Sequence, residues 1–205
     1  MKPDNPIRIL CFGDSLTAGT PGYDPVYGGD LRFQYGYWLL RFAESFGVTN
    51  LSFRNHGVPG DLAAAMPDRL ARALESGKYE VIIILAGSND LGWNYPAESV
   101  HASLRRLWDI ARSGNHALVT CTVPPIAAVY PLIQKGQRYL NRMILSNVSD
   151  ERNTICVNVF AVLADERGLL PSEYDSGDGL HFSLKGYRRL GEVIWDEGVR
   201  RLLDD

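Results

Sequence analysis

The sequence feature that most constrains the fold is the apolar segment Val81–Leu85, which contains no polar residue. A strand with one face in water alternates apolar and polar side chains, because successive residues point to opposite faces of a sheet. A continuous apolar strand is typical of parallel sheets that helices cover on both sides. This segment therefore predicts the centre of a parallel sheet inside an α/β protein.

Other strand-like and helix-like segments alternate along the chain on both sides of this one. Short β-branched or alternating segments occupy residues 7–12, 51–55, 117–122 and 155–159. Longer segments between and after them carry apolar residues at helical spacing. Their apolar stripes are Tyr35, Trp38, Leu39, Phe42 and Phe46; Leu62, Met66, Leu70 and Leu74; Val100, Leu104, Leu107 and Ala111; Leu140, Met143, Ile144 and Val148; and Leu184, Tyr187, Leu190 and Ile194.

Local signals refine three of these helices. Asp61 precedes the second stripe and Ser183 precedes the last, and both residue types favour the N-cap position. Pro67 lies inside the second stripe, where a proline kinks a helix or restarts it. We therefore expect a helix capped by Asp61 with a break at Pro67, and a final helix capped by Ser183.

Five strand–helix pairs in 205 residues predict one α/β domain, spanning residues 1–205. Crossovers between parallel strands are almost always right-handed, which leaves doubly wound topologies as the simplest arrangement. The sequence thus predicts a flavodoxin-like three-layer α/β/α sandwich with a five-stranded parallel sheet.

Charge and composition narrow the range of partners. The chain carries 21 basic and 24 acidic residues, a formal charge of −3, and no basic run, so it lacks the electrostatic footprint of a nucleic-acid-binding protein. Pro124, Pro125 and Pro131 interrupt its longest uncharged window, which disfavours a membrane span. We expect a small-molecule partner, while both a monomer and a homo-oligomer stay open.

The amino terminus and the cysteines indicate the cellular compartment in which the protein is expected. Two prolines and an aspartate occupy the first six residues, where a signal peptide would begin its apolar stretch, so we expect a cytoplasmic protein. The three cysteines, Cys11, Cys121 and Cys156, lie in apolar segments without metal-ligand spacing. They are interpreted as buried free thiols.

Polar or glycine-rich clusters follow four of the expected strands, at residues 13–19, 55–61, 86–90 and 178–183. In open α/β sheets, ligands bind outside the carboxyl ends of the strands. These four clusters are therefore expected to converge on one edge of the sheet and to form the functional site there.

The residue types in these clusters fit acyl transfer. Ser15 is a weak nucleophile unless a base lies within hydrogen-bond reach and a third group orients that base. His181 and Asp178, three residues apart, can supply the base and the orienting carboxylate. The N–H groups of Ser15 and Gly60 and the side-chain amide of Asn89 are candidate donors to the developing oxyanion.

Other site classes fit less well. Residues 13–19 lack the Gly-Lys-Ser/Thr ending of a phosphate-binding loop, no Gly-x-Ser-x-Gly elbow is present, and no His or Cys pattern suggests a metal, so no cofactor or metal is expected. A non-catalytic flavodoxin-like module that holds FMN or a nucleotide phosphate stays as the alternative, although phosphate binding does not need the late Asp178 and His181 pair. A dimeric scaffold that uses aromatic segments as an interface is a third alternative.

Four sequence blocks carry a resemblance to a known family. They are Gly13-Asp14-Ser15-Leu16-Thr17, Asn55-x-Gly57-x-x-Gly60-Asp61, Gly87-x-Asn89-Asp90 and Asp178-x-x-His181. In order and spacing, over most of the chain, they resemble the blocks of the SGNH (GDSL) hydrolases, most of all the small arylesterase, acetylesterase and lysophospholipase types.

The resemblance implies a fold, an activity and roles. It implies the flavodoxin-like SGNH fold and a serine esterase that cleaves small acyl, aryl or acetyl esters through an acyl-enzyme, without a cofactor. The implied catalytic residues are Ser15, His181 and Asp178, with the oxyanion hole formed by Ser15, Gly60 and Asn89. The sequence departs from the family at Phe182, where many members carry proline.

The ester itself stays open among aryl esters, carbohydrate acetyl groups, lysophospholipids and thioesters. The candidate substrate-binding residues are Trp93, Ile126, Val129 and Tyr130, which favour an apolar acyl or aryl group. Residues 20–34, a glycine-rich insertion after the nucleophile block, are a candidate binding loop.

Overall fold

The protein is described by a computed structural model that covers residues 5–114, 116–148 and 153–204. Its main sheet has five strands in the order β4-β1-β5-β6-β7, and every neighbouring pair is parallel. The order runs 2-1-3-4-5 along the chain, which is the flavodoxin-like arrangement that the sequence predicts. The strands are β1 Ile7–Gly13, β4 Leu51–Gly57, β5 Val81–Leu85, β6 Ala117–Cys121 and β7 Thr154–Val157.

The central strand β5 is covered on both faces, as its composition requires. Val81, Ile83 and Leu85 pack into one core cluster, and Ile82 and Ile84 pack into a second cluster on the opposite face. Because both faces are buried, no position in this strand favours a polar side chain.

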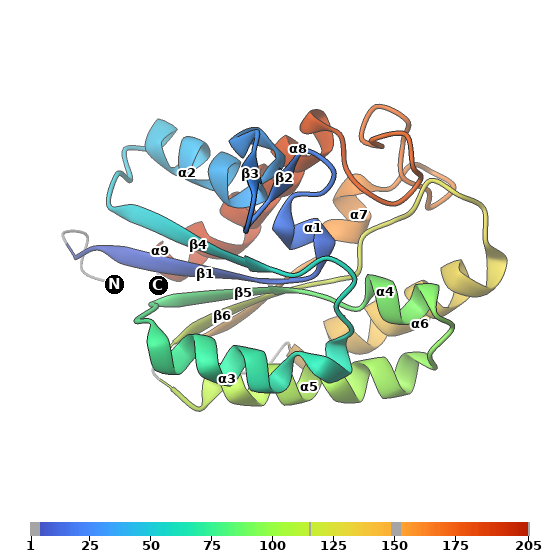
Figure 1. Cartoon of the computed structure of the whole chain (residues 1–205), viewed down its shortest axis with the longest axis horizontal. Coiled ribbons are helices and arrows are strands. Elements are labelled where there is room, and N and C mark those ends of the chain that lie inside the picture. Colours follow the sequence, from blue (N-terminus) through green and yellow to red (C-terminus); the bar gives the residue numbers. More distant parts are fainter. Residues whose placement is uncertain (1–4, 115, 149–152, 205) are drawn as a thin grey trace.

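Helices cover both faces of the sheet, which gives three layers (Figure 1). One layer contains α2 Tyr35–Ser45, α7 Val159–Leu163 and α8 Leu184–Ile194, which continues through the π-helical segment Trp195–Val199 into α9 Arg200–Asp204. The opposite layer contains α3 Pro67–Ser76, α5 Ala97–Arg112 and α6 Pro131–Val148. The predicted three-layer α/β/α sandwich is thus confirmed.

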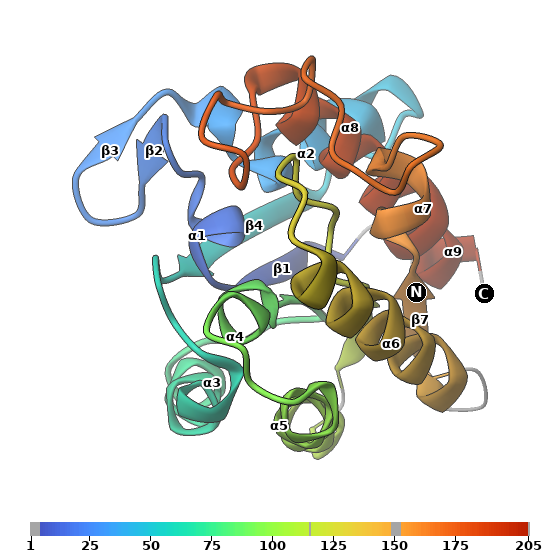
Figure 2. The ribbon, with the colours of Figure 1, turned by 90° about the vertical axis from the view of Figure 1, so that its right-hand side faces the viewer.

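Two short helices lie at the carboxyl edge of the sheet. Helix α1, Ser15–Ala18, follows β1, and helix α4, Ser88–Gly92, follows β5. Figure 2 views this edge directly and shows α1 and α4 close to the middle of it. The strands β1 and β5 are neighbours in the sheet, so the segments that follow them emerge side by side.

Several local predictions are corrected. Helix α3 begins at Pro67 with no side-chain cap, and a short 3-10 turn, Ala63–Ala65, replaces the expected helical start after Asp61. Proline is favoured in the first turn of a helix because its missing N–H needs no partner there. The expected cap at Ser183 is confirmed, since its hydroxyl accepts the N–H of Gly186 at 3.2 Å.

The remaining differences concern segment ends. Val159 starts α7 instead of ending the last strand, and α6 begins at Pro131, earlier than its apolar stripe suggests. Residues 20–34 form a small hairpin of β2 Tyr23–Asp24 and β3 Gly28–Gly29, followed by the 3-10 turn Leu31–Phe33. Over the described ranges, none of the helices is both long and apolar enough to cross a membrane.

Candidate active site

The predicted nucleophile, Ser15, is the first residue of α1 and lies directly after β1. Asp14 caps this helix, because its carboxylate Oδ1 accepts the N–H of Leu16 at 3.0 Å. The Asp14 carboxylate thus holds the turn that leads into α1. Ser15 is 5% exposed, so the fold presents its hydroxyl at the carboxyl edge of the sheet while burying most of the residue.

The structure brings Ser15 together with the two other predicted catalytic residues across 166 positions of sequence. The Nε2 atom of His181 lies 2.9 Å from the Oγ atom of Ser15, and the Nδ1 atom of His181 lies 2.6 Å from Oδ2 of Asp178. In this chain of contacts, a carboxylate orients an imidazole whose other nitrogen meets a hydroxyl. That is the geometry that serine hydrolases require.

A tight turn between β7 and α8 prepares Asp178 for this role. Its Oδ1 atom accepts the N–H groups of Leu180 at 2.9 Å and His181 at 2.8 Å, while Oδ2 contacts the ring of His181. Burial by itself raises the pKa of Asp178, but the hydrogen bonds from the His181 backbone, the His181 ring and Leu180 together hold that pKa well below its usual range. The residue stays an anion at neutral pH, as an orienting carboxylate must.

Phe182, at the position where the family often has proline, anchors this turn in the core. Its side chain is fully buried and packs edge-to-face on Tyr187 of α8, with ring centroids 5.4 Å apart. The backbone of Ser176 also donates to the carbonyl oxygen of His181 at 2.9 Å. An aromatic anchor and backbone hydrogen bonds thus hold the loop without proline.

The three predicted oxyanion donors come from the ends of three different strands. Gly60 has φ +80°, and an added Cβ would meet nothing within 4 Å, so the left-handed backbone is the reason for glycine here. The N–H groups of Ser15 and Gly60 donate to no other group in the described part of the chain. The Nδ2 atom of Asn89 donates to the carbonyl oxygen of Asp61 at 3.0 Å, which ties α4 to the residue after Gly60.

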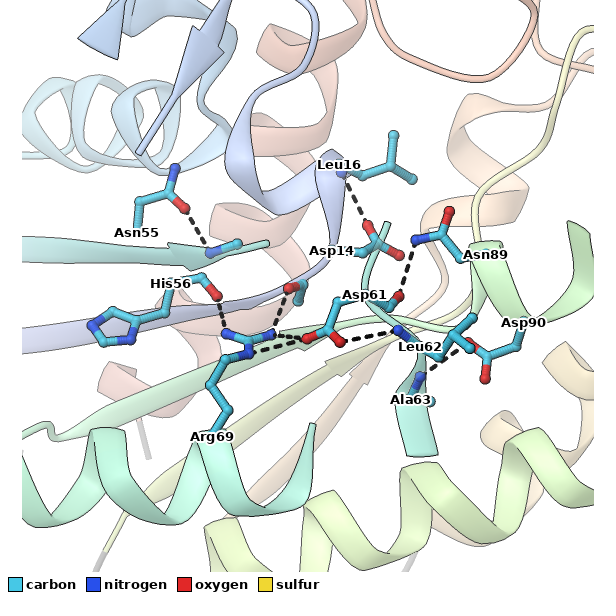
Figure 3. Close-up of polar contacts among 12 residues, drawn as sticks. Asp14, Leu16, Asn55, His56, Asp61, Leu62, Ala63, Arg69, Asn89 and Asp90 are labelled. Carbon is cyan, nitrogen blue, oxygen red and sulfur yellow. Dashed lines mark hydrogen bonds and ion pairs between the residues drawn. The ribbon is translucent and has the colours of Figure 1, made fainter. Parts of the chain in front are cut away.

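Asn55, the first residue of the second sequence block, and Arg69, which no sequence pattern marks, hold this turn in place (Figure 3). Asn55 accepts the N–H of Gly57 at 2.9 Å and donates to the carbonyl oxygen of Ala18 at 2.9 Å. Arg69, on α3, binds Asp61 and the carbonyl oxygens of His56 and Gly13. A lone arginine in an amphipathic helix gives no sequence signal of this kind, because its partners lie far away along the chain.

A pocket of about 360 Å³ adjoins the predicted catalytic residues. Asn89 and Asp178 both line it, together with three of the predicted substrate-binding residues, Trp93, Ile126 and Tyr130. Val129, the fourth, is 66% exposed and does not belong to the described lining. The lining is mostly apolar, and it includes Gly179 and Leu180 of the turn that carries Asp178 and His181.

Two polar side chains of α6 hold the pocket wall that residues 123–133 form. Asn141 binds both the N–H and the carbonyl oxygen of Val123, at 2.7 and 2.9 Å, and Gln137 donates to the carbonyl oxygen of Pro124. The N–H of Ala127 donates to the carbonyl oxygen of Gly179 at 2.9 Å, which joins this wall to the catalytic turn.

Other candidate residues lie elsewhere. The hairpin of residues 20–34 and the segment 123–133 lie on opposite sides of α1 (Figure 2).

His101 is 8% exposed and packs on Trp108, because it lies on the buried face of α5. The described residues contain no cluster of three or more His, Cys, Asp or Glu side chains suited to a metal ion.

The four sequence blocks and the geometry of the site correspond to one family. The profile of the GDSL-like Lipase/Acylhydrolase family matches residues 11–189. The chain belongs to this family. As a GDSL hydrolase it carries the family motif at Gly13, Asp14, Ser15 and Leu16, and the match extends past His181 into α8.

Other solved structures share the fold of this GDSL hydrolase at low sequence identity. The structure of TesA is 20% identical over 95% of this chain and 99% of its own, with a TM-score of 0.75. A family 3 carbohydrate esterase from Clostridium thermocellum is 17% identical over 98% of both chains, with a TM-score of 0.74. The psychrotrophic esterase EstA from Pseudoalteromonas sp. is 18% identical over 97% of this chain and 99% of its own, also with a TM-score of 0.74. Comparison with curated protein sequences gives no match.

Proposed function

We propose that this GDSL hydrolase is a serine esterase that cleaves small carboxylic esters through an acyl-enzyme. The observation that carries the proposal is the continuous contact from Asp178 through His181 to the hydroxyl of Ser15, at 2.6 and 2.9 Å. A serine oxygen becomes an effective nucleophile only when such a base can take its proton.

The reaction proceeds in two steps at these atoms. Ser15 Oγ attacks the ester carbonyl carbon while its proton moves to His181 Nε2, and that proton then goes to the departing alkoxide. Water next attacks the acyl-enzyme, gives a proton to His181 Nε2 and releases the acid, and Ser15 Oγ regains the proton. Asp178 accepts the Nδ1–H of His181 throughout and stabilises the imidazolium.

Three donors stabilise the negative charge that develops on the carbonyl oxygen. The N–H groups of Ser15 and Gly60 have no other partner in the described part of the chain, so both are available to an incoming oxyanion. The side-chain amide of Asn89 uses one hydrogen for the carbonyl oxygen of Asp61 and has a second one for the substrate. Donors fixed in this way cost no reorganisation during the reaction.

The pocket favours a small apolar group. Its volume of about 360 Å³ lies near the lower end of the usual range for ligand sites, roughly 300–1,000 Å³. Ile126 and Tyr130 provide an apolar wall, and Trp93, 74% exposed, offers an aromatic face at the surface. We infer short acyl chains or an aryl group as the preferred substituents.

Acidic residues argue against the phosphate-binding alternative. The carboxyl groups of Asp14, Asp61 and Asp90 interact electrostatically at the sheet edge, around the backbone that would have to receive a phosphate. Asp178 also lines the adjoining pocket, and the described lining contains no basic side chain that could bind a phosphate. An ester, which is neutral, meets no such penalty.

Labelling with a fluorophosphonate, which reacts with activated serines, tests the nucleophile. The wild-type protein and Ser146→Ala, a change at an exposed serine of α6, should take up the label. Ser15→Ala should take up none and should lose the hydrolysis of p-nitrophenyl acetate. Labelling that persists in Ser15→Ala would place the nucleophile elsewhere, and an unlabelled, inactive wild type would refute the esterase proposal.

The substrate class is tested by a chain-length series of p-nitrophenyl esters together with acetylated sugars. A steep fall in kcat/KM beyond short acyl groups is expected from the size of the pocket. Higher rates on long acyl chains would contradict this inference, and higher rates on acetylated sugars would show that the leaving group, not the acyl group, decides specificity.

A further inference from the structure

Arg69, on α3, binds several groups at the carboxyl edge of the sheet, outside its own helix. Its Nε and Nη2 atoms bind Oδ2 of Asp61 at 3.0 and 2.8 Å, and Nη2 also donates to the carbonyl oxygen of Gly13 at 2.9 Å. Its Nη1 atom donates to the carbonyl oxygen of His56, and its guanidinium lies 4.0 Å from the centre of the Phe12 ring. One side chain thus joins the ends of β1 and β4.

The acidic partner, Asp61, is next to Gly60 in the chain and is hydrogen-bonded to Asn89, so it contacts two of the three proposed oxyanion donors. It follows Gly60 directly, and its N–H donates to the carbonyl oxygen of Val58 at 3.1 Å. Its own carbonyl oxygen accepts a hydrogen bond from the side-chain amide of Asn89 at 3.0 Å. A shift of this one residue would move both the Gly60 N–H and the Asn89 amide. Figure 3 shows its carboxylate turned toward Arg69 and its carbonyl oxygen turned toward Asn89.

The contact with Gly13 extends this arrangement to the nucleophile. Gly13 lies two residues before Ser15, and its carbonyl oxygen accepts both the Val58 N–H at 3.1 Å and the Arg69 Nη2–H. The same carbonyl therefore links the nucleophile strand, the Gly60 turn and α3. With side-chain exposures of 21% and 15% for Arg69 and Asp61, water competes little for these contacts.

We propose that Arg69 is a positioning residue for catalysis, which acts through Asp61 and the Gly13 carbonyl to fix the Gly60 and Asn89 donors relative to Ser15. This inference rests on the proposed esterase function. Only arginine can fill the role, because a planar group with five N–H donors is needed to bind a carboxylate and two carbonyls at once. Lysine would keep the charge and lose the geometry.

The first arm of the test separates positioning from folding. Arg69→Met is compared with wild type and with Arg72→Met, a matched change at an exposed arginine of the same helix. Displacing oxyanion donors weakens binding in the transition state alone, so Arg69→Met should lose roughly 100-fold in kcat with KM kept within about twofold. Arg69→Lys should also fall well below wild type. If Arg69→Met does not fold, kcat and KM of Arg69→Lys are compared with those of wild type and Arg72→Met instead.

The second arm asks whether the effect passes through the oxyanion hole. In an Asn89→Ala background one of the positioned donors is already missing, so adding Arg69→Met should cost less than about fivefold more. Millimolar guanidinium, far below the molar concentrations that unfold proteins, should restore part of the kcat of Arg69→Ala and none of that of Asn89→Ala. A residue that only stabilises the fold would show neither result.

Each outcome decides one proposal. A wild-type kcat in Arg69→Met, or losses that multiply fully with Asn89→Ala, would overturn the positioning role. The esterase proposal would survive this, provided that wild type and Arg72→Met turn over and take the fluorophosphonate label at Ser15. An inactive and unlabelled wild type would instead overturn the esterase proposal and the positioning role with it.

Discussion

Asp14, the residue before the proposed nucleophile Ser15, is fully buried, and this makes the stability of the protein depend on pH. Burial raises the pKa of its carboxyl from 3.8 to about 7, and the nearby carboxylates of Asp90 and Asp61 add to the rise, although the hydrogen bond from Leu16 opposes it. Its Oδ2 atom is buried without a hydrogen-bond partner among the described residues. The folded protein therefore favours the neutral carboxyl group.

The size and sign of the effect follow from this pKa. A rise from 3.8 to about 7 is worth up to roughly 4 kcal/mol of unfolding free energy, at 1.36 kcal/mol per pKa unit. Because the folded state binds this proton more tightly than the unfolded chain, the stabilisation is complete below about pH 4 and is lost as the pH rises toward about 7. Asp14→Asn keeps the oxygen that accepts the Leu16 N–H, but its side chain cannot ionise. The unfolding free energy of this variant therefore does not fall in this way as the pH rises.

Urea unfolding at a series of pH values measures the effect. The unfolding free energy of Asp14→Asn minus that of wild type should rise between about pH 4 and pH 8, by as much as roughly 4 kcal/mol. Asp68→Asn, at an exposed aspartate of α3, serves as the matched control and should show no comparable trend. A difference between Asp14→Asn and wild type that stays flat across this range would refute the reasoning, since Asp14 would then titrate alike in both states.

Three further predictions concern the site itself. Asn89→Ala should lower kcat about 100- to 1,000-fold, and its urea midpoint should fall only by the loss of the hydrogen bond to Asp61, about 1 kcal/mol. A kcat near the wild-type value would remove Asn89 from the mechanism. Asp178→Asn should lower kcat on p-nitrophenyl acetate by up to about 10⁴-fold, because an amide no longer fixes the tautomer of His181, and a loss of only a fewfold would mean that another group orients the ring. Trp93→Ala should widen the range of accepted acyl chains in the p-nitrophenyl series, whereas Phe46→Ala, at an exposed aromatic outside the pocket, should not. An unchanged acyl preference in Trp93→Ala would place the acyl group elsewhere.

The sheet could be predicted from the sequence because its signal is local. Each strand carries its own apolar pattern, and Val81–Leu85 contacts helices on both faces, so burial alone determines the residues that it can contain. The positions of Ser15 and Asn89 follow from the same logic, since residues directly after parallel strands meet at one edge. His181 lies beyond α7, just before α8, so its place was predicted from the Asp178 and His181 spacing and from the family resemblance as well.

The role of Asp61 could not be predicted in this way. An aspartate before an apolar helical stripe has the pattern of an N-cap, but Pro67 sets the start of α3 and the Asp61 carboxylate binds Arg69 instead. Asp61 and Arg69 are 8 residues apart, and the other contacts of Arg69, with His56 and Gly13, span 13 and 56 residues. Local periodicity contains no information about such long-range hydrogen bonds.

The two halves of the proposed catalytic site are held by different contacts, and this difference determines how each half tolerates substitutions. His181 is held by its own turn, where Asp178 binds two backbone N–H groups within three residues and Phe182 anchors the chain in the core. Ser15 belongs to a helix of only four residues, which is too short to fix its own direction, so contacts from β4 and α3 must do so. Substitutions in the first half therefore act near the base, whereas distant positions such as Arg69 can alter the second half without touching the substrate.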